Sequence, residues 1–153
     1  RITPDDLLEF LKTHNSSIEK IFKNTLEYSI GIIDLELKYL RLFAIDYSIY
    51  GAFGDIPEKG TILNEFLVSL IGEKYFASFG ADTLKSLNDR FIKYGNSLKQ
   101  GMGDPCMVGK TFSYLCCGEH DPLIAFRGAI EFNSIVNFLP DILLKKSSSG
   151  GKR

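Results

Sequence analysis

The chain has 153 residues, of which 44% are apolar and 12% aromatic, and its formal net charge is −1. This length is typical of one domain that can bury enough surface to fold without a disulfide or a metal ion, and the apolar content excludes intrinsic disorder. Four of the 18 Lys and Arg residues, Lys145, Lys146, Lys152 and Arg153, lie in or beside the Ser/Gly tail. The rest of the chain is therefore more acidic than the total implies, which argues against a nucleic-acid-binding surface.

The cysteines and the apolar segments indicate a cellular compartment. Cys106, Cys116 and Cys117 form an odd set, and adjacent cysteines rarely bridge each other, so the chain suits a reducing environment. We find no signal peptide and no stretch that approaches the roughly 18 apolar residues of a membrane-spanning helix. We therefore expect a cytoplasmic protein that does not enter a membrane.

Helix-initiation signals recur along the chain. Thr3 and Pro4 open the first predicted helix, and Ser16 and Glu19 form a capping box for the second. Similar signals precede four more helices, and the expected ranges are 4–14, 17–51, 61–79, 83–99, 105–117 and 122–144. The two-residue alternation of a half-buried sheet is missing. The sequence therefore predicts an all-α, single-domain bundle of five to six helices.

The second predicted helix is apolar on two sides. Its polar positions form a narrow stripe of Glu27, Asp34, Lys38, Arg41 and Ser48. Its apolar residues form two rows, one of Leu26, Ile30, Ile33, Leu37, Leu40, Ala44 and Tyr47, the other of Tyr28, Ile32, Leu35, Tyr39, Leu42 and Ile49. Such a helix must be covered on two sides, so we place it at the centre of the bundle. A rod of about 50 Å is longer than the domain, so either the helix bends near Gly31 or its excess length packs on a partner chain.

The C-terminal residues differ in composition from the rest. The run Ser147-Ser148-Ser149-Gly150-Gly151 is typical of a flexible segment. We assign residues 1–146 to the helical bundle domain and residues 147–153 to a flexible Ser/Gly tail.

Two short motifs carry weak signals for phosphate or metal binding. Gly109-Lys110-Thr111 matches the end of a phosphate-binding loop, but Asp104 occupies the place of the first glycine and would repel phosphate. Cys116, Cys117 and His120 are weak candidates for metal ligands, because they lack the paired spacing of zinc sites. We expect these cysteines to fill the core and expect no cofactor.

Five residues form a candidate ligand site: Asp46, Tyr47 and Tyr50 on the second helix, and Arg127 and Glu131 on the last. Charged residues within apolar rows are seldom buried without a partner. One reading is a pair between helices, such as Asp46 with Arg127, or an Arg127–Glu131 pair that faces water. The other reading is a set of polar anchors in an apolar pocket. Asn133 and Asn137 suit the same network or a polar interface.

Three functions remain open. The first, which we favour, is a non-catalytic interaction or regulatory domain that forms a homodimer through surplus apolar helix surface. The second is a domain that binds a small apolar or aromatic ligand at the five residues named above. The third, an enzyme or a metal or thiol protein, is the least favoured; His14 and His120 are the two histidines, too few for a carboxylate–histidine di-metal bundle.

Overall fold

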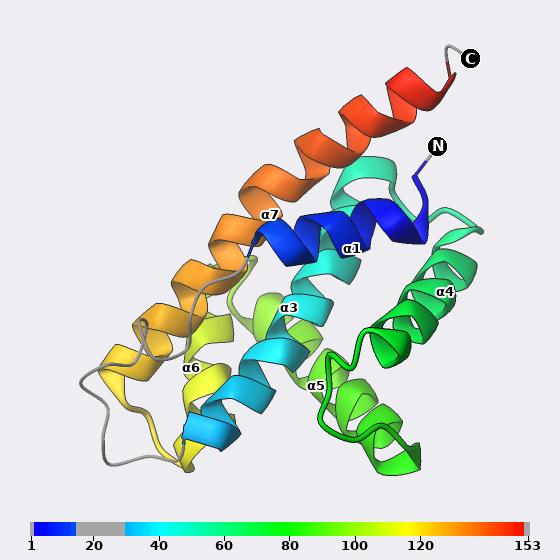
Figure 1. Cartoon of the computed structure of the whole chain (residues 1–153). Coiled ribbons are helices and arrows are strands. Elements are labelled where there is room, and N and C mark those ends of the chain that lie inside the picture. Colours follow the sequence, from blue (N-terminus) through cyan, green and yellow to red (C-terminus); the bar gives the residue numbers. More distant parts are fainter. Residues whose placement is uncertain (1, 15–29, 152–153) are drawn as a thin grey trace.

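The computed structural model describes residues 2–14 and 30–151 of the chain. These residues contain no strand and form helices α1 (Pro4–Thr13), α3 (Ile30–Phe53), α4 (Lys59–Gly72), α5 (Ala81–Gln100), α6 (Pro105–Cys117) and α7 (Pro122–Gly151) (Figure 1). The predicted all-α bundle is confirmed. None of the described helices combines the length and the apolar character that crossing a membrane requires.

Helix α3 lies at the centre of the fold, as its two apolar rows predict. It packs along α7, and α5 and α6 also contact it (Figure 1). Both rows are buried over much of their length: Leu37 and Leu40 of the first, and Leu42 and Ile49 of the second, are at most 3% exposed. Residues 17–29 of the predicted second helix lie outside the described residues.

The helix ends follow the capping signals of the sequence. At the start of α1, the Thr3 hydroxyl accepts a hydrogen bond from the Asp6 amide, and the Asp6 carboxylate accepts one from the Thr3 amide. Asp104 caps α6 by accepting from the amide of Cys106 at 2.9 Å. Gly118 ends α6 in the left-handed conformation, with φ of 77°, which glycine adopts without strain.

Helix α4 ends earlier than predicted, at Gly72 rather than at residue 79. Lys74 has φ of 55°, and the amide of Tyr75 donates back to the carbonyl of Leu70 at 3.0 Å, which is the reversal that closes a Schellman motif. The turn brings Phe76 against Tyr39 of α3, with ring centroids 5.6 Å apart. Packing of these aromatic rings on α3 therefore competes successfully with continuation of the helix.

Helix α7 continues to Gly151. Residues 147–151, which we expected to begin a flexible tail, are thus helical. Pro140 lies inside α7, where it removes one backbone hydrogen bond without ending the helix. The division at residue 146 stays a prediction about domain organisation.

Helices α6 and α7 pack closely through two glycines. A Cβ atom at Gly109 would overlap the carbonyl oxygen of Ala125 and lie 2.9 Å from the Cβ of Ala129. A Cβ at Gly128 would lie 2.5 Å from the Cδ2 atom of Phe112. The Gly109-Lys110-Thr111 motif is therefore part of a helix, and its glycine lets two helix backbones approach each other.

Candidate functional site

A buried carboxylate, Glu131 of α7, joins three helices. Its Oε1 atom accepts a hydrogen bond from Nε of Arg41 on α3 at 2.8 Å and one from Nε2 of His14, just after α1, at 3.0 Å. Burial acts to raise the pKa of Glu131, but the hydrogen bonds and charges of His14 and Arg41 outweigh it and lower the pKa. Glu131 is therefore ionised, and the positive charge of Arg41 balances it inside the fold.

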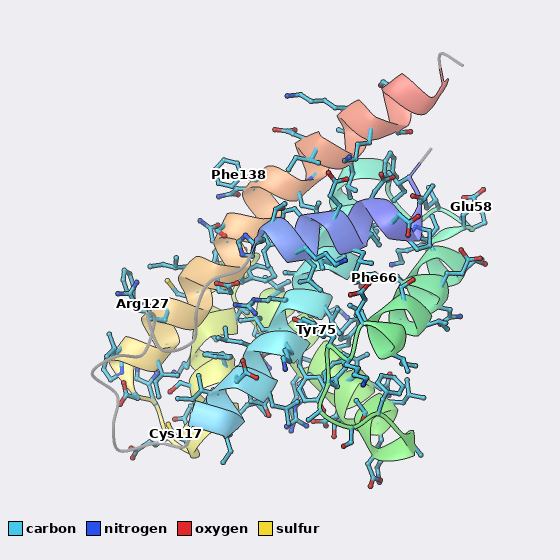
Figure 2. The ribbon with its side chains drawn as sticks, in the orientation of Figure 1. Glu58, Phe66, Tyr75, Cys117, Arg127 and Phe138 are labelled. Carbon is cyan, nitrogen blue, oxygen red and sulfur yellow. The ribbon has the colours of Figure 1, made fainter. Side chains whose placement is uncertain are left out.

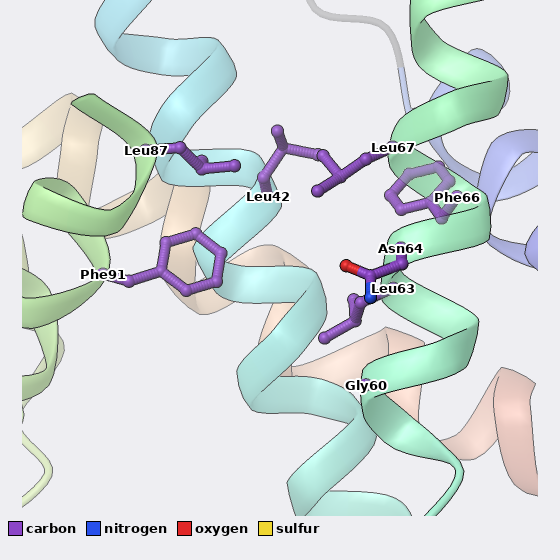
Figure 3. A pocket seen from close by; sticks show the side chains of 8 residues that line it. All are labelled: Leu42, Gly60, Leu63, Asn64, Phe66, Leu67, Leu87 and Phe91. Atoms are coloured by element: carbon purple, nitrogen blue, oxygen red, sulfur yellow. The ribbon is translucent and has the colours of Figure 1, made fainter. Parts of the chain in front are cut away.

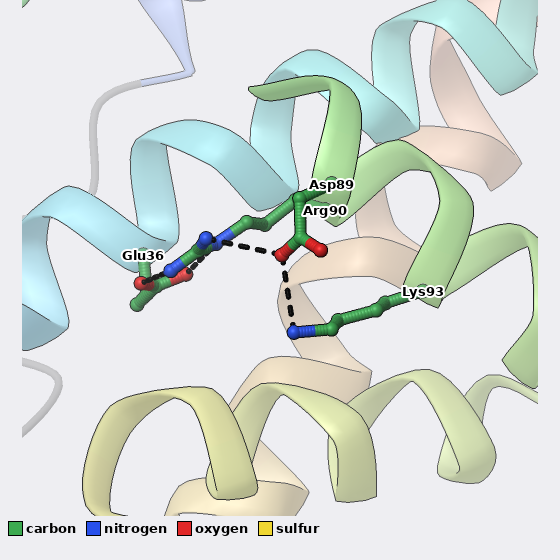
Figure 4. Close-up of polar contacts among 4 residues, drawn as sticks. All are labelled: Glu36, Asp89, Arg90 and Lys93. Atoms are coloured by element: carbon green, nitrogen blue, oxygen red, sulfur yellow. Dashed lines mark hydrogen bonds and ion pairs between the residues drawn. The ribbon is translucent and has the colours of Figure 1, made fainter. Parts of the chain in front are cut away.

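A second buried ion pair joins α3 to α5. Arg90 donates from Nε and Nη2 to the two carboxylate oxygens of Glu36, at 3.1 and 2.7 Å (Figure 4). Asp89 accepts from Arg90 at 3.2 Å and pairs with Lys93 at 3.1 Å. The hydrogen bonds to Glu36 outweigh burial and raise the pKa of Arg90. This bidentate pair fixes the position of α5 against the central helix.

The five residues of the predicted ligand site are dispersed. Asp46 pairs with Lys59 at 3.5 Å, and Lys59 lies 5.9 Å from the centre of the Tyr50 ring, so these three meet where α3 and α4 begin to diverge. Burial raises the pKa of Asp46, although Lys59 opposes the shift. Tyr47 stacks on Phe43 instead.

Arg127 and Glu131 do not join this group, and the reading that paired Asp46 with Arg127 is wrong, because Asp46 pairs with Lys59. Arg127 is exposed on the side of α7 that faces away from α3, as its labelled side chain illustrates (Figure 2). Glu131, one turn later, is 7% exposed and turns inward to Arg41. The Arg127–Glu131 pair facing water is also ruled out, because Glu131 points into the fold while Arg127 points into solvent.

The cysteine segment is mainly a packing element. Cys116 is buried, and burial raises the pKa of its thiol, which disfavours the reactive thiolate. Cys117 donates from Sγ to the carbonyl of Ser113 at 3.3 Å, while His120 is exposed. Across residues 2–14 and 30–151, no three His, Cys, Asp or Glu residues gather in a way that could hold a metal ion.

An apolar groove of about 240 Å³ lies between α3, α4 and α5. Asn64 contributes the one polar side chain of its lining, and Figure 3 shows the amide directed towards the open space between the helices. The remaining residues of the lining are Leu42, Gly60, Leu63, Phe66, Leu67, Leu87 and Phe91. None of these eight was predicted from sequence to line a binding site. The apolar ones cannot be distinguished by their pattern, because a residue that lines an open groove is as apolar as a core residue.

The side of α7 that faces away from the bundle is also apolar, and we call it the outer face. Its large apolar residues are 42–66% exposed: Leu123, Phe126, Ile130, Phe138 and Leu144. Arg127, Asn133, Asn137 and Asp141 are exposed among them. Figure 2 shows Arg127 and Phe138 projecting from the same edge of the helix, away from its neighbours. Asn133 and Asn137 thus lie on a surface and not in the Glu131 network.

The groove and the outer face of α7 are two apolar features of the described surface. They differ in shape, since one is concave and is lined by three helices, while the other is a ridge formed by one helix. Comparison of the chain with protein-family models, with curated proteins and with solved structures finds no match.

Proposed function

We propose that this protein is a non-catalytic interaction domain that self-associates through the outer face of α7. The observation that carries the proposal is the exposure of five large apolar side chains along one face of that helix. A helix of 30 residues extends about 45 Å, so the face is long enough for another helix to lie along it.

The exposed side chains of the outer face are not required to build the core of this chain. The opposite face of α7 already supplies the core with Ile124, Phe132, Ile135, Leu139 and Leu143, each at most 1% exposed. Soluble monomers rarely expose a large contiguous apolar patch, and such patches are typical of interaction sites. Phenylalanine and arginine, both present on the outer face, are enriched in protein interfaces. A partner surface that covers this face would remove its apolar area from water.

The buried charges support a structural role over a catalytic one. Glu131 and Glu36 each accept hydrogen bonds from an arginine, so both carboxylates are held by fixed partners within the fold. A general acid or base needs a pKa near the working pH and access to a substrate. These two carboxylates act instead as links between helices.

The test is a dilution series of the wild type and of a variant with Phe126→Ser and Ile130→Ser, with the mass measured by sedimentation. We expect the wild type to dimerise and the variant to be monomeric, because the variant loses two apolar contacts on each copy. Ile92→Ser is the matched control, since Ile92 is exposed to a similar degree, at 56%, but lies on α5. A wild type that stays monomeric up to about 1 mM, where the binding free energy is only about −4 kcal/mol, contradicts the proposal.

The groove supports a second candidate function, binding of a small aromatic molecule. Its lining is apolar with one inward amide, which is the usual composition of a small-molecule site. An apolar cavity of about 150 Å³ accepts benzene, so a groove of about 240 Å³ suits one or two fused rings with a polar group for Asn64. The Asp46–Lys59 pair lies beside Gly60, at one end of the groove.

Titration with indole, followed by NMR, tests this candidate. We expect shifts of the Leu63 and Leu67 methyl signals in the wild type, and we expect Leu63→Trp to abolish the shift of the Leu67 signals because the new side chain fills the groove. Leu84→Trp, at an exposed position of α5 outside the groove lining, should leave that shift unchanged. Equal shifts in both variants would contradict binding in the groove.

A further inference from the structure

Two pairs of positions on the outer face of α7 are symmetric about one residue. Ser134 is its midpoint: Ile130 and Phe138 lie four residues before and after it, and Arg127 and Asp141 lie seven residues before and after it. In an α-helix, steps of four and seven residues return to about the same face after one and two turns. The matched positions are therefore apolar with apolar and positive with negative.

Resting on the self-association proposed above, we propose that α7 pairs with α7 of a second copy in antiparallel orientation, with a twofold axis near Ser134. In this arrangement Arg127 lies opposite the partner's Asp141. Twofold symmetry repeats every contact, so the ion pair forms twice. Ile130 packs opposite the partner's Phe138, on both sides of the axis.

The charges select this orientation over the parallel one. Parallel helices in register would place Arg127 against Arg127 and Asp141 against Asp141, so like charges would face each other at both ends. Antiparallel helices place opposite charges together at both ends. Complementary charge of this kind fixes register and suppresses wrong pairings more than it adds affinity.

Both charges are available for a partner. Arg127 and Asp141 are exposed, and neither forms an ion pair with any residue that the structure describes. Each could have been paired locally, as Lys38 is with Asp34 one turn away at 3.1 Å. From Arg127 the nearest opposite charge on the outer face is instead Asp141, two turns beyond the midpoint, which is the spacing that an antiparallel copy satisfies. Lys145 is exposed one turn after Asp141, but the two form no ion pair among the described residues.

The residues near the axis suit close contact between helices. Ser134 is small and half-buried, so it allows two helix axes to approach to about 8–10 Å. Asn133 and Asn137 flank it and are exposed. The centre of the face thus allows two helices to approach closely, and Ile130 and Phe138 supply apolar area on both sides of it.

Charge reversal tests the orientation. Arg127→Asp makes both ion pairs repulsive, and so does Asp141→Arg, so each variant alone should dimerise about tenfold more weakly than the wild type at low salt. An equimolar mixture of the two variants should dimerise as well as the wild type, because the mixed dimer has two opposite-charge pairs. The doubly reversed variant should also recover. Lys85→Asp, an exposed charge reversal on α5, is the control and should have no effect.

Crosslinking separates this inference from the self-association on which it rests. In a background with Cys106→Ser, chains carrying Arg127→Cys should form disulfides with chains carrying Asp141→Cys in preference to chains of their own kind. If Phe126→Ser with Ile130→Ser abolishes the dimer but neither charge rescue nor this crosslink is seen, self-association stands and the antiparallel arrangement is overturned. If the wild type never dimerises, both fail.

Discussion

The two faces of α7 both carry large apolar side chains and charged side chains, but one face is buried and the other is exposed. On the inner face, Ile124, Glu131 and Phe132 are at most 7% exposed, and the charge of Glu131 is held by Arg41. The outer face combines Phe126, exposed to 60%, with Arg127, which has no ion-pair partner among the described residues. Both faces therefore carry large apolar groups and a charge, but only the inner one has its complement within the same chain.

This difference teaches that burial of a charge depends on a specific partner and not on apolar neighbours. Arg127 and Glu131 are one helical turn apart, yet one is exposed and the other is buried. Glu131 is tolerated inside because Arg41 and His14 supply donors at 2.8 and 3.0 Å. We infer that a second molecule supplies the ion-pair partners and the apolar contacts that the outer face lacks within its own chain.

Removing Glu131 breaks the inner face most severely. Glu131→Ala leaves the buried guanidinium of Arg41 without its carboxylate, and we expect a loss of about 3–5 kcal/mol in the free energy of unfolding, measured by urea denaturation. Arg127→Ala on the outer face should change the same quantity by less than about 0.5 kcal/mol. A double variant with Arg41→Leu and Glu131→Leu should recover most of the loss. Equal effects at Glu131 and Arg127 would contradict the distinction between the faces.

A smaller effect is expected where α6 meets the inner face. Gly109→Ala forces a methyl group against the carbonyl oxygen of Ala125, so the helices must separate, and we expect a loss of about 1–3 kcal/mol in thermal or urea unfolding. Gly95→Ala on α5 is the matched control, because a Cβ there meets nothing within 4 Å. That control should gain up to about 1 kcal/mol from helix propensity. A stable Gly109→Ala variant would show that α6 and α7 are less closely packed than described.

The smallest effects are expected in the pH dependence of stability, which differs between the buried carboxylates Glu131 and Asp46. Because the pKa of Glu131 is lowered in the fold, its charge stabilises the protein above the ordinary value of 4.5, and this contribution disappears as the pH falls through the lower folded value. Because the pKa of Asp46 is raised, its charge destabilises the fold at neutral pH, and that cost disappears in acid.

Substitutions without charge should therefore respond in opposite directions. From acidic to neutral pH, Glu131→Gln should lose stability relative to the wild type, and Asp46→Asn should gain it. Urea denaturation at several pH values measures both. A common sign for the two variants would contradict the environments assigned to these carboxylates.

The sequence allowed the fold to be predicted because helix formation depends on neighbours along the chain. The caps at Thr3, Asp104 and Asp121 and the stop at Gly118 lie where the pattern placed them. The end of α4 was missed because it depends on Phe76 reaching Tyr39, a contact between residues far apart in sequence.

The candidate site was much less predictable, for the same reason. Arg41 was assigned to the polar stripe of the central helix, but its partner Glu131 lies 90 residues away. Glu36 drew no prediction at all, and its partner Arg90 is 54 residues away. Asp46 was singled out as a buried charge, yet its partner proved to be Lys59 instead of Arg127. Periodicity identifies the helices, but it does not identify which charges meet between them.

Native mass spectrometry of freshly purified wild-type protein, without added ligand, tests self-association through α7 in a single experiment. We expect a dimer with no additional mass, which the variant with Phe126→Ser and Ile130→Ser fails to form. A monomer at every concentration would contradict self-association through α7. If that monomer carried a bound molecule of small mass, the groove between α3, α4 and α5 would become the leading site.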